Sequence, residues 1–388
     1  MSRFAALDGL RGICALGVAL FHLRVAFHVF DNPLVREAYV LVDFFFVLSG
    51  FVIAHAYGQR LATAPEVGSF LIRRIGRVWP LHIAVLALMV ALEAIRLVLA
   101  SRLGTDIRLP FSGETGPETL IPNALLVHAW GLSVLTWNVP SWSISAELLA
   151  YLLFAIVSFI ARSRTLAVVA AILAVGWVAS VKLAPDVEFY AQLSSLRAIC
   201  SFFAGVLVHA LFTRVGPMQV TKLGGSLIEV AVAALVVGYM LFVSDERLTP
   251  WAVPVFAAAI LAFASERGVI SDFLKLPALQ VIGTLSYSIY LTHSLVLTAF
   301  NALAKGIGRV LHVDVMVPAP TLFEGMAERG IDWDLVHFGS FWLDDLYALA
   351  FLAAVIGLST LTYRFIEMPG QRLFAGLAKA RTDLKIPA

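Results

Sequence analysis

Arg11 and His22 both lie within the first long apolar stretch of the chain. They are eleven residues apart, which is about three helical turns, so in a helix both side chains project from one face about 16 Å apart. A charged side chain inside a membrane span costs at least about 2.5 kcal/mol unless it meets a partner or a polar cavity. The pair therefore predicts an intramembrane site.

Four titratable side chains on four apolar stretches are predicted to share one layer of the membrane. They are His22, Asp43, Glu147 and His293, each about 7 to 17 Å beneath the outer end of its stretch. A histidine and a carboxylate in a dry layer suit general acid–base chemistry. Glu147 also has Ser143 and Tyr151 four residues to either side, so its own helix face offers hydrogen-bond partners.

A second group of charges lies near the opposite, cytoplasmic edge. It consists of Arg11 and the run Arg73, Arg74 and Arg77. Guanidinium groups are planar and always charged, which suits multidentate binding of phosphate. The alternative is that these arginines only anchor the chain to the membrane surface beside an interfacial Trp79.

Structural interpretations stay open for most of these residues. Polar networks without catalysis would explain His22 and Glu147, and also His293 with Tyr290 and Ser286 on its face. Asp43 could simply mark the outer edge of its span. The pair Ser49-Gly50 would let two helices approach closely, and this interpretation is favoured over a nucleophilic serine because no base lies nearby in sequence.

The composition is that of a polytopic membrane protein. Of 388 residues, 60% are hydrophobic and 14% are charged, whereas soluble domains carry about 25% charged residues. A net charge of +2 argues against a nucleic-acid surface. Cys14 and Cys200 lie in apolar stretches, so the sequence predicts neither a disulfide framework nor a metal site.

The predicted fold class is all-α, a helical membrane bundle with both termini cytoplasmic. Ten spans are expected near 8–29, 38–58, 78–100, 142–161, 165–182, 194–212, 224–243, 250–265, 280–304 and 344–366. This topology puts fifteen lysines and arginines on the cytoplasmic side against eight outside. Segment 121–137 is treated as re-entrant or interfacial, because counting it as a span would invert everything downstream. One transmembrane domain, 1–370, precedes a basic cytoplasmic tail, 371–388.

Six blocks of the sequence, taken together and in order, resemble the membrane acyltransferase-3 family of bacterial proteins. That family O-acylates surface polysaccharides, lipopolysaccharide, Nod factors or macrolides. The blocks are 7–12 with His22, then 43–51, 73–80, 138–147, 285–293 and 363–369. The family's pattern residues match Arg11, His22, Arg74, Arg77, Trp142, Ser143 and Glu147. Met368 stands where arginine is usual, which leaves the role of Glu367 open.

The resemblance implies an acyl-CoA donor, which we expect to be acetyl-CoA, and no tightly bound cofactor. It also implies a carbohydrate, polysaccharide or lipid-linked glycan acceptor at the outer face of the bacterial cytoplasmic (inner) membrane, among membrane lipid and without nucleic acid. Nothing in the sequence predicts the oligomeric state. On this hypothesis Arg11, Arg73, Arg74 and Arg77 hold the nucleotide end of the donor.

The same hypothesis makes His22 the general base, oriented or charge-balanced by Glu147. The residues expected to bind substrate or stabilise the oxyanion are Asp43, Ser49, Trp142, Ser143, Tyr287, Tyr290 and His293. A covalent acyl group on His22 or Ser49 before transfer is left open.

Two other classes of protein compete with the enzyme. A proton-coupled transporter or flippase would use His22, Glu147 and Asp43 as a proton relay, with the arginines selecting an anionic substrate. A non-catalytic scaffold for polysaccharide assembly would make the intramembrane charges dispensable.

Overall fold

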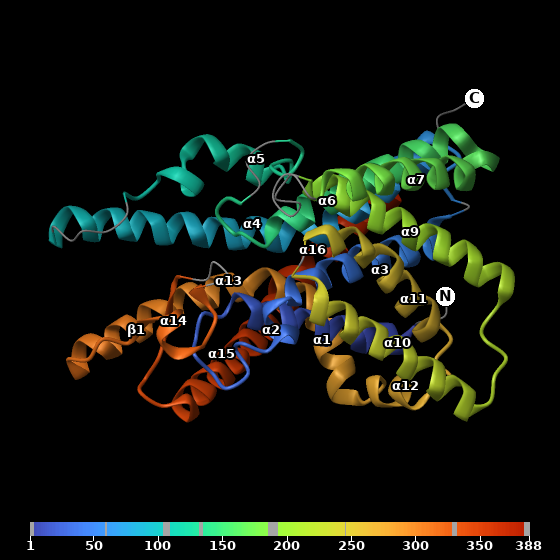
Figure 1. Ribbon diagram of the computed structural model, residues 1–388. Coiled ribbons are helices and arrows are strands. Elements are labelled where there is room, and N and C mark those ends of the chain that lie inside the picture. Colours follow the sequence, from blue (N-terminus) through green and yellow to red (C-terminus); the bar gives the residue numbers. More distant parts are fainter. Residues whose placement is uncertain are drawn as a thin grey trace.

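The structure of the protein, a computed structural model, is a bundle of long helices that run side by side (Figure 1). The structure describes residues 4–58, 60–103, 109–131, 135–184, 193–244, 246–327 and 332–383. Arg108 and Arg329 of the predicted outer loops, and residues 384–388 of the predicted tail, lie outside the described residues.

The long helices are α1 (Ala5–His22), α3 (Leu41–Tyr57), α4 (Ala64–Leu103), α6 (Ser141–Ala161), α7 (Thr165–Leu183), α9 (Ser194–Val215), α10 (Lys222–Phe242), α11 (Ala252–Ala264), α13 (Pro277–Leu311), α15 (Phe341–Thr362) and α16 (Met368–Asp383). Shorter helices are α2 (Pro33–Arg36), α5 (Leu120–Ala124), α12 (Val269–Leu274) and α14 (Ala319–Leu322). A two-stranded antiparallel sheet pairs β1 (Met316–Pro318) with β2 (Asp334–Val336).

The described residues form nine helical segments long and apolar enough to cross a membrane. One of them, Ser141–Leu183, contains both α6 and α7, which a 3₁₀ turn at Arg162–Arg164 separates. Arg162 has a φ of 48°, and α6 and α7 both pack along α9. The chain therefore turns back at Arg162, and each of the ten predicted spans corresponds to its own helix. The prediction of an all-α polytopic bundle is confirmed.

The first helix is shorter than predicted. α1 ends at His22, and the expectation that it continues to about residue 29 is wrong. The backbone after it joins the edge of β2 instead: the N–H of Ala26 donates to the carbonyl of Val336 (2.9 Å), and the N–H of Val336 donates to that of Arg24 (3.0 Å). His22 therefore lies at the end of its helix, so the depth predicted from a longer helix does not apply.

Segment 121–137 is not a spanning helix where the structure describes it. Only α5 is helical, and the irregular backbone that follows is held by side chains of neighbouring helices. The hydroxyl of Ser145 in α6 donates to the carbonyl of Leu126 (2.8 Å) and accepts the N–H of Ala129 (3.1 Å). The last carbonyls of α5 contact α4, where Trp79 donates its indole N–H to that of Ala124 (2.9 Å). Non-helical backbone in a membrane protein needs such partners, as the sequence predicted.

Two pairs of helices approach closely at glycine. A Cβ on Gly12 of α1 would lie 2.6 Å from the backbone nitrogen of Gly283 in α13. A Cβ on Gly50 of α3 would overlap the carbonyl of Phe202 in α9. Small residues of this kind let membrane helices pack backbone to backbone. The structural interpretation of Gly50 is therefore confirmed, and α1 is fixed against α13 as α3 is against α9.

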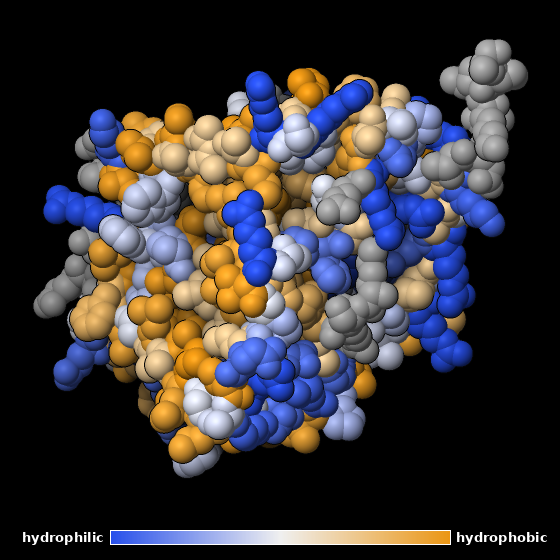
Figure 2. Space-filling model, turned by 90° about the vertical axis from the view of Figure 1, so that its right-hand side faces the viewer, coloured by the Kyte–Doolittle hydropathy of each residue, from blue (hydrophilic) through white to orange (hydrophobic). Residues whose placement is uncertain are grey.

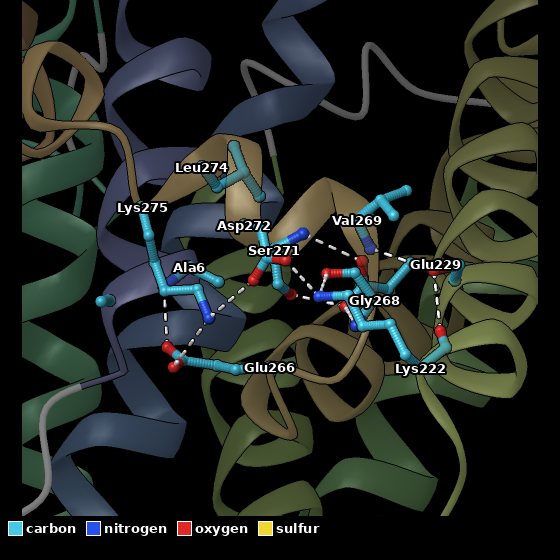
Figure 3. Close-up of polar contacts among 12 residues, drawn as sticks. Ala6, Lys222, Glu229, Glu266, Gly268, Val269, Ser271, Asp272, Leu274 and Lys275 are labelled. Atoms are coloured by element: carbon cyan, nitrogen blue, oxygen red, sulfur yellow. Dashed lines mark hydrogen bonds and ion pairs between the residues drawn. The ribbon is translucent and has the colours of Figure 1, made fainter.

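One end of the bundle carries a polar network around α12 (Figure 3). The buried carboxylate of Glu229 in α10 accepts the N–H groups of Gly268 (2.7 Å) and Ser271 (2.9 Å), which caps this short helix. Beside it, hydrogen bonds from Lys222 and Lys275 hold the pKa of Asp272 below its usual value. Hydrophilic side chains gather on parts of this end of the molecule (Figure 2).

Candidate active site

A polar cavity lies inside the bundle, between α1, α3, α4, α6 and α13. Its volume is 160 Å³, and its polar lining is Arg11, Ser49, Arg74, Arg77, Ser143, Glu147, Tyr151, Ser286, Tyr287 and Tyr290. The apolar remainder includes Val42, Phe45, Phe46 and Ile53. The structure thus brings predicted residues from five helices into a single cavity.

Three side chains form a hydrogen-bonded chain on one wall. The hydroxyl of Tyr151 donates to Glu147 Oε1 (2.6 Å) and lies 3.0 Å from Ser49 Oγ. Since the single hydroxyl proton of Tyr151 is given to the carboxylate, Ser49 is the donor in the second bond. The local partner predicted for Glu147 four residues along its helix is confirmed for Tyr151. Ser143 instead lies 2.7 Å from the hydroxyl of Tyr290.

The arginines of α4 separate into two groups. Arg74 and Arg77 line the cavity, whereas Arg73 is absent from its lining. The guanidinium of Arg74 lies 5.6 Å from the ring centre of Tyr57, and its buried Nε has no hydrogen-bond partner among the described residues. Arg11 lines the same cavity and donates to the carbonyl of Gly283 (2.9 Å).

Glu367 fixes the position of Arg77. It ends a π-helical turn, Tyr363–Glu367, between α15 and α16, and its side chain is 1% exposed. Its carboxylate pairs with Arg77 and accepts hydrogen bonds from Ser288 (2.7 Å) and Gln371 (3.1 Å). The residue whose role the sequence left open therefore ties α4, α13 and α16 together behind the cavity.

His22 and His293 face each other where α1 packs on α13. Nδ1 of His22 lies 2.9 Å from the carbonyl of Val18 and 3.2 Å from Nε2 of His293, and the ring centres are 4.9 Å apart. No described contact joins His22 to Glu147, so the expected pairing of these two residues is replaced by a pair of histidines. Tyr290, which lines the cavity, connects the two regions because its ring centre lies 6.0 Å from that of His293.

Asp43 lies outside the lining of the cavity, in a buried ion pair. Its carboxylate accepts from Nε (2.9 and 3.0 Å) and Nη2 (2.6 Å) of Arg197 and from the hydroxyl of Ser201 (3.0 Å). Asp43 is 1% exposed and Arg197 is 2% exposed. Both carboxylate oxygens of Asp43 therefore have protein partners, and substrate binding by Asp43 stays a prediction.

Trp142 is held by the same pair. The guanidinium carbon of Arg197 lies 5.5 Å from the ring centre of Trp142, and Phe46 packs edge-on against the indole. Trp142 is absent from the cavity lining, but it lies in the first turn of α6, the helix that carries Ser143 and Glu147. Tyr287 does line the cavity and donates its hydroxyl to the carbonyl of Val78 (2.5 Å).

Sequence reasoning did not assign Tyr151, Arg197 and Glu367 to the site. In the sequence, Tyr151 stands out only as a neighbour of Glu147. Arg197 carried a usable signal, since an arginine within an apolar span is costly and normally has a partner. Its partner Asp43 is 154 residues away in sequence, so the pairing itself was invisible.

Fold and site together define a class: a multi-pass integral membrane protein with a polar cavity inside its helical bundle. Arginines and a glutamate line that cavity, and a histidine pair lies close to it. Residues 4–364 match the family model described as "Acyltransferase domain". The chain belongs to this acyltransferase family, as the resemblance in its sequence blocks implied.

Three curated relatives show how far the likeness extends. "Acyltransferase MdmB" of Streptomyces mycarofaciens is 27% identical over 78% of this chain and 81% of its own length. "Exopolysaccharide production protein ExoZ" of Rhizobium meliloti (strain 1021) is 28% identical over 77% of this chain and 89% of its own. "Protein 2 in picA locus" of Rhizobium radiobacter is 44% identical, but over 23% of this chain and 45% of that protein. No solved structure matches the chain significantly.

Proposed function

We propose that this protein is a membrane O-acyltransferase of the bacterial inner membrane. It moves an acyl group, which we expect to be acetyl, from cytoplasmic acyl-CoA to a hydroxyl of a carbohydrate or glycan-like acceptor on the outer side. The observation that carries the proposal is the single cavity that holds Arg74, Arg77 and Glu147 and reaches Tyr290, next to the histidine pair. Family membership supports the class of reaction.

The arginine end of the cavity suits the phosphates of the donor. Guanidinium groups bind phosphate oxygens with two parallel hydrogen bonds. The unpartnered Nε of Arg74 leaves a donor for that purpose, whereas Arg77 is already held by Glu367 and contributes mainly its fixed charge. Arg11 extends the same wall from α1.

The histidine end suits the transfer step. His22 takes the proton of the acceptor hydroxyl as the oxygen attacks the thioester carbonyl; the C–S bond then breaks, and the thiolate leaves and recovers that proton. Glu147 lies in the cavity with Tyr151 and Ser49, so its carboxylate would act on the donor side of the site. Tyr287 and Tyr290 supply hydroxyl groups near the path of the acyl group.

The acceptor is proposed from the relatives. One relative is named for exopolysaccharide production and another as an acyltransferase. The first name favours a polysaccharide or other glycan acceptor, and the second supports the class of reaction.

The activity is tested with sealed membrane vesicles, acetyl-CoA labelled in the acetyl group, and envelope or secreted glycans. We expect labelled glycan to form, and to depend on His22. Uptake of a solute driven by a pH gradient, without thioester consumption, would support the transporter instead. A glycan that is assembled normally by protein lacking the intramembrane charges would support the scaffold.

Arg74→Ala should raise the KM for acyl-CoA about tenfold to a hundredfold, which is the loss of one charge-assisted hydrogen bond. The KM for the acceptor should stay unchanged. Steady-state kinetics with each substrate varied separately checks this, and Arg164→Ala, an exposed arginine outside the cavity, is the matched control. A rise in the acceptor KM alone would show that the donor site is misplaced.

A further inference from the structure

The contacts of the two histidines determine where their protons lie. Nδ1 of His22 lies 2.9 Å from the carbonyl of Val18, and Nδ1 of His293 lies 3.3 Å from the carbonyl of Ile289. A carbonyl oxygen only accepts hydrogen bonds, so each Nδ1 must carry the hydrogen. In the neutral state both rings then have a bare lone pair on Nε2.

The lone pair of His293 has a defined partner. Its Nε2 lies 3.2 Å from Nδ1 of His22, which places it as an acceptor of the same N–H that reaches Val18. His293 is completely buried, and its ring is fixed between its own helix and that of His22. The second nitrogen of His22, Nε2, makes no hydrogen bond within the described chain and is the basic atom left for a substrate.

We propose that His293 is a positioning residue for His22. Together with the carbonyl of Val18, it holds His22 in the Nδ1–H tautomer and so leaves Nε2 for the acceptor hydroxyl. It accepts the Nδ1 hydrogen bond more strongly once His22 becomes imidazolium. This proposal rests on the proposed function, in which His22 is the general base. It replaces the expected carboxylate partner, Glu147, with a neutral acceptor in the role that an aspartate has in a Ser-His-Asp triad.

A neutral partner fits the surroundings of the pair. Tyr290 packs on His293 and Phe21 packs on His22, and no carboxylate contacts either ring among the described residues. A buried carboxylate beside a resting, neutral histidine would be an uncompensated charge within the membrane. A second imidazole costs no such charge at rest, and still accepts the hydrogen bond when His22 takes a proton.

The kinetic test compares His293→Leu with His293→Gln. Leucine keeps the volume but removes the acceptor, and kcat should fall about tenfold to a hundredfold with the KM of both substrates unchanged, as for other residues that orient a functional histidine. Glutamine places an amide oxygen near the position of Nε2, and should restore kcat to within a few fold of wild type. Thermal unfolding in detergent checks that both variants fold.

The second test reads the tautomer directly. In protein labelled with ¹⁵N-histidine, His22 is assigned by comparing spectra of wild type and His22→Gln. We expect Nδ1 to be protonated and Nε2 to be bare in wild type, with a weaker preference in His293→Leu, where the carbonyl of Val18 is the acceptor that remains. A protonated Nε2 in neutral His22 would overturn the inference.

The outcomes separate this inference from the proposed function. If His22→Ala abolishes transfer while a folded His293→Leu keeps full kcat, the inference is wrong and the proposed function stands. If His22→Ala keeps full activity, both are wrong.

Discussion

Replacing His22 by alanine should lower the rate of acyl transfer by at least about 10², the usual share of a general base. The expected loss is in kcat, because the donor cavity is lined by other residues. The fall should be larger than that of His293→Leu, since alanine removes the base itself and not only its orientation. Transfer from labelled acetyl-CoA to the glycan, measured in vesicles with equal amounts of inserted protein, checks the result.

The matched control is His209→Gln. His209 is also a histidine on a long apolar helix, α9, and it contacts His55 (3.3 Å) away from the cavity lining. The transfer activity of the His209→Gln variant should stay within a few fold of wild type. Equal losses in both variants would mean that general damage to the bundle, and not loss of the base, explains the effect of His22→Ala.

Asp43→Ala should destabilise the folded protein by about 3–5 kcal/mol, the cost of leaving one member of a buried ion pair without its partner. The charge left behind is the guanidinium of Arg197, which is 2% exposed. Trp142 rests on that guanidinium at the start of α6, so activity per folded molecule should fall as well. Unfolding midpoints in detergent, compared with wild type, measure the loss of stability.

A double variant separates the structural role of Asp43 from substrate binding. Asp43→Leu combined with Arg197→Met removes both charges, and buried ion pairs replaced by apolar residues often lose little stability. The double variant should therefore have a higher unfolding midpoint in detergent than Asp43→Ala. If Asp43→Ala instead kept full stability and raised only the KM for the acceptor, Asp43 would be a substrate ligand, as its sequence position first indicated.

The spans and the residues with chemistry were predictable, because both depend on properties that sequence displays locally. Apolar length determines a membrane helix, and an ionisable residue within it is costly enough to stand out. That is why α4, α6 and α13 were found together with Arg77, Glu147 and His293. The bounds of α1 were not predictable, because the residues after His22 are apolar enough to continue a helix but pair with β2 instead.

The partners within the site were less predictable, and the reason is distance along the chain. Arg77 and Glu367 are 290 residues apart, and His22 and His293 are 271 apart. Sequence reasoning paired His22 with Glu147 because both were expected in one layer, but depth does not specify which faces of the helices meet.

The sequence by itself determined that this protein is a helical membrane bundle of the acyltransferase type with arginines, acids and histidines held inside it. Only the tertiary structure decided which of them are partners across the bundle: histidine with histidine, Asp43 with Arg197, and Arg77 with Glu367. The free-energy cost of a charge in a membrane span depends on the segment that carries it, so the sequence of that one segment is enough to predict it. The choice of partner is set by close packing at positions such as Gly12 and Gly50, where helices distant in sequence meet.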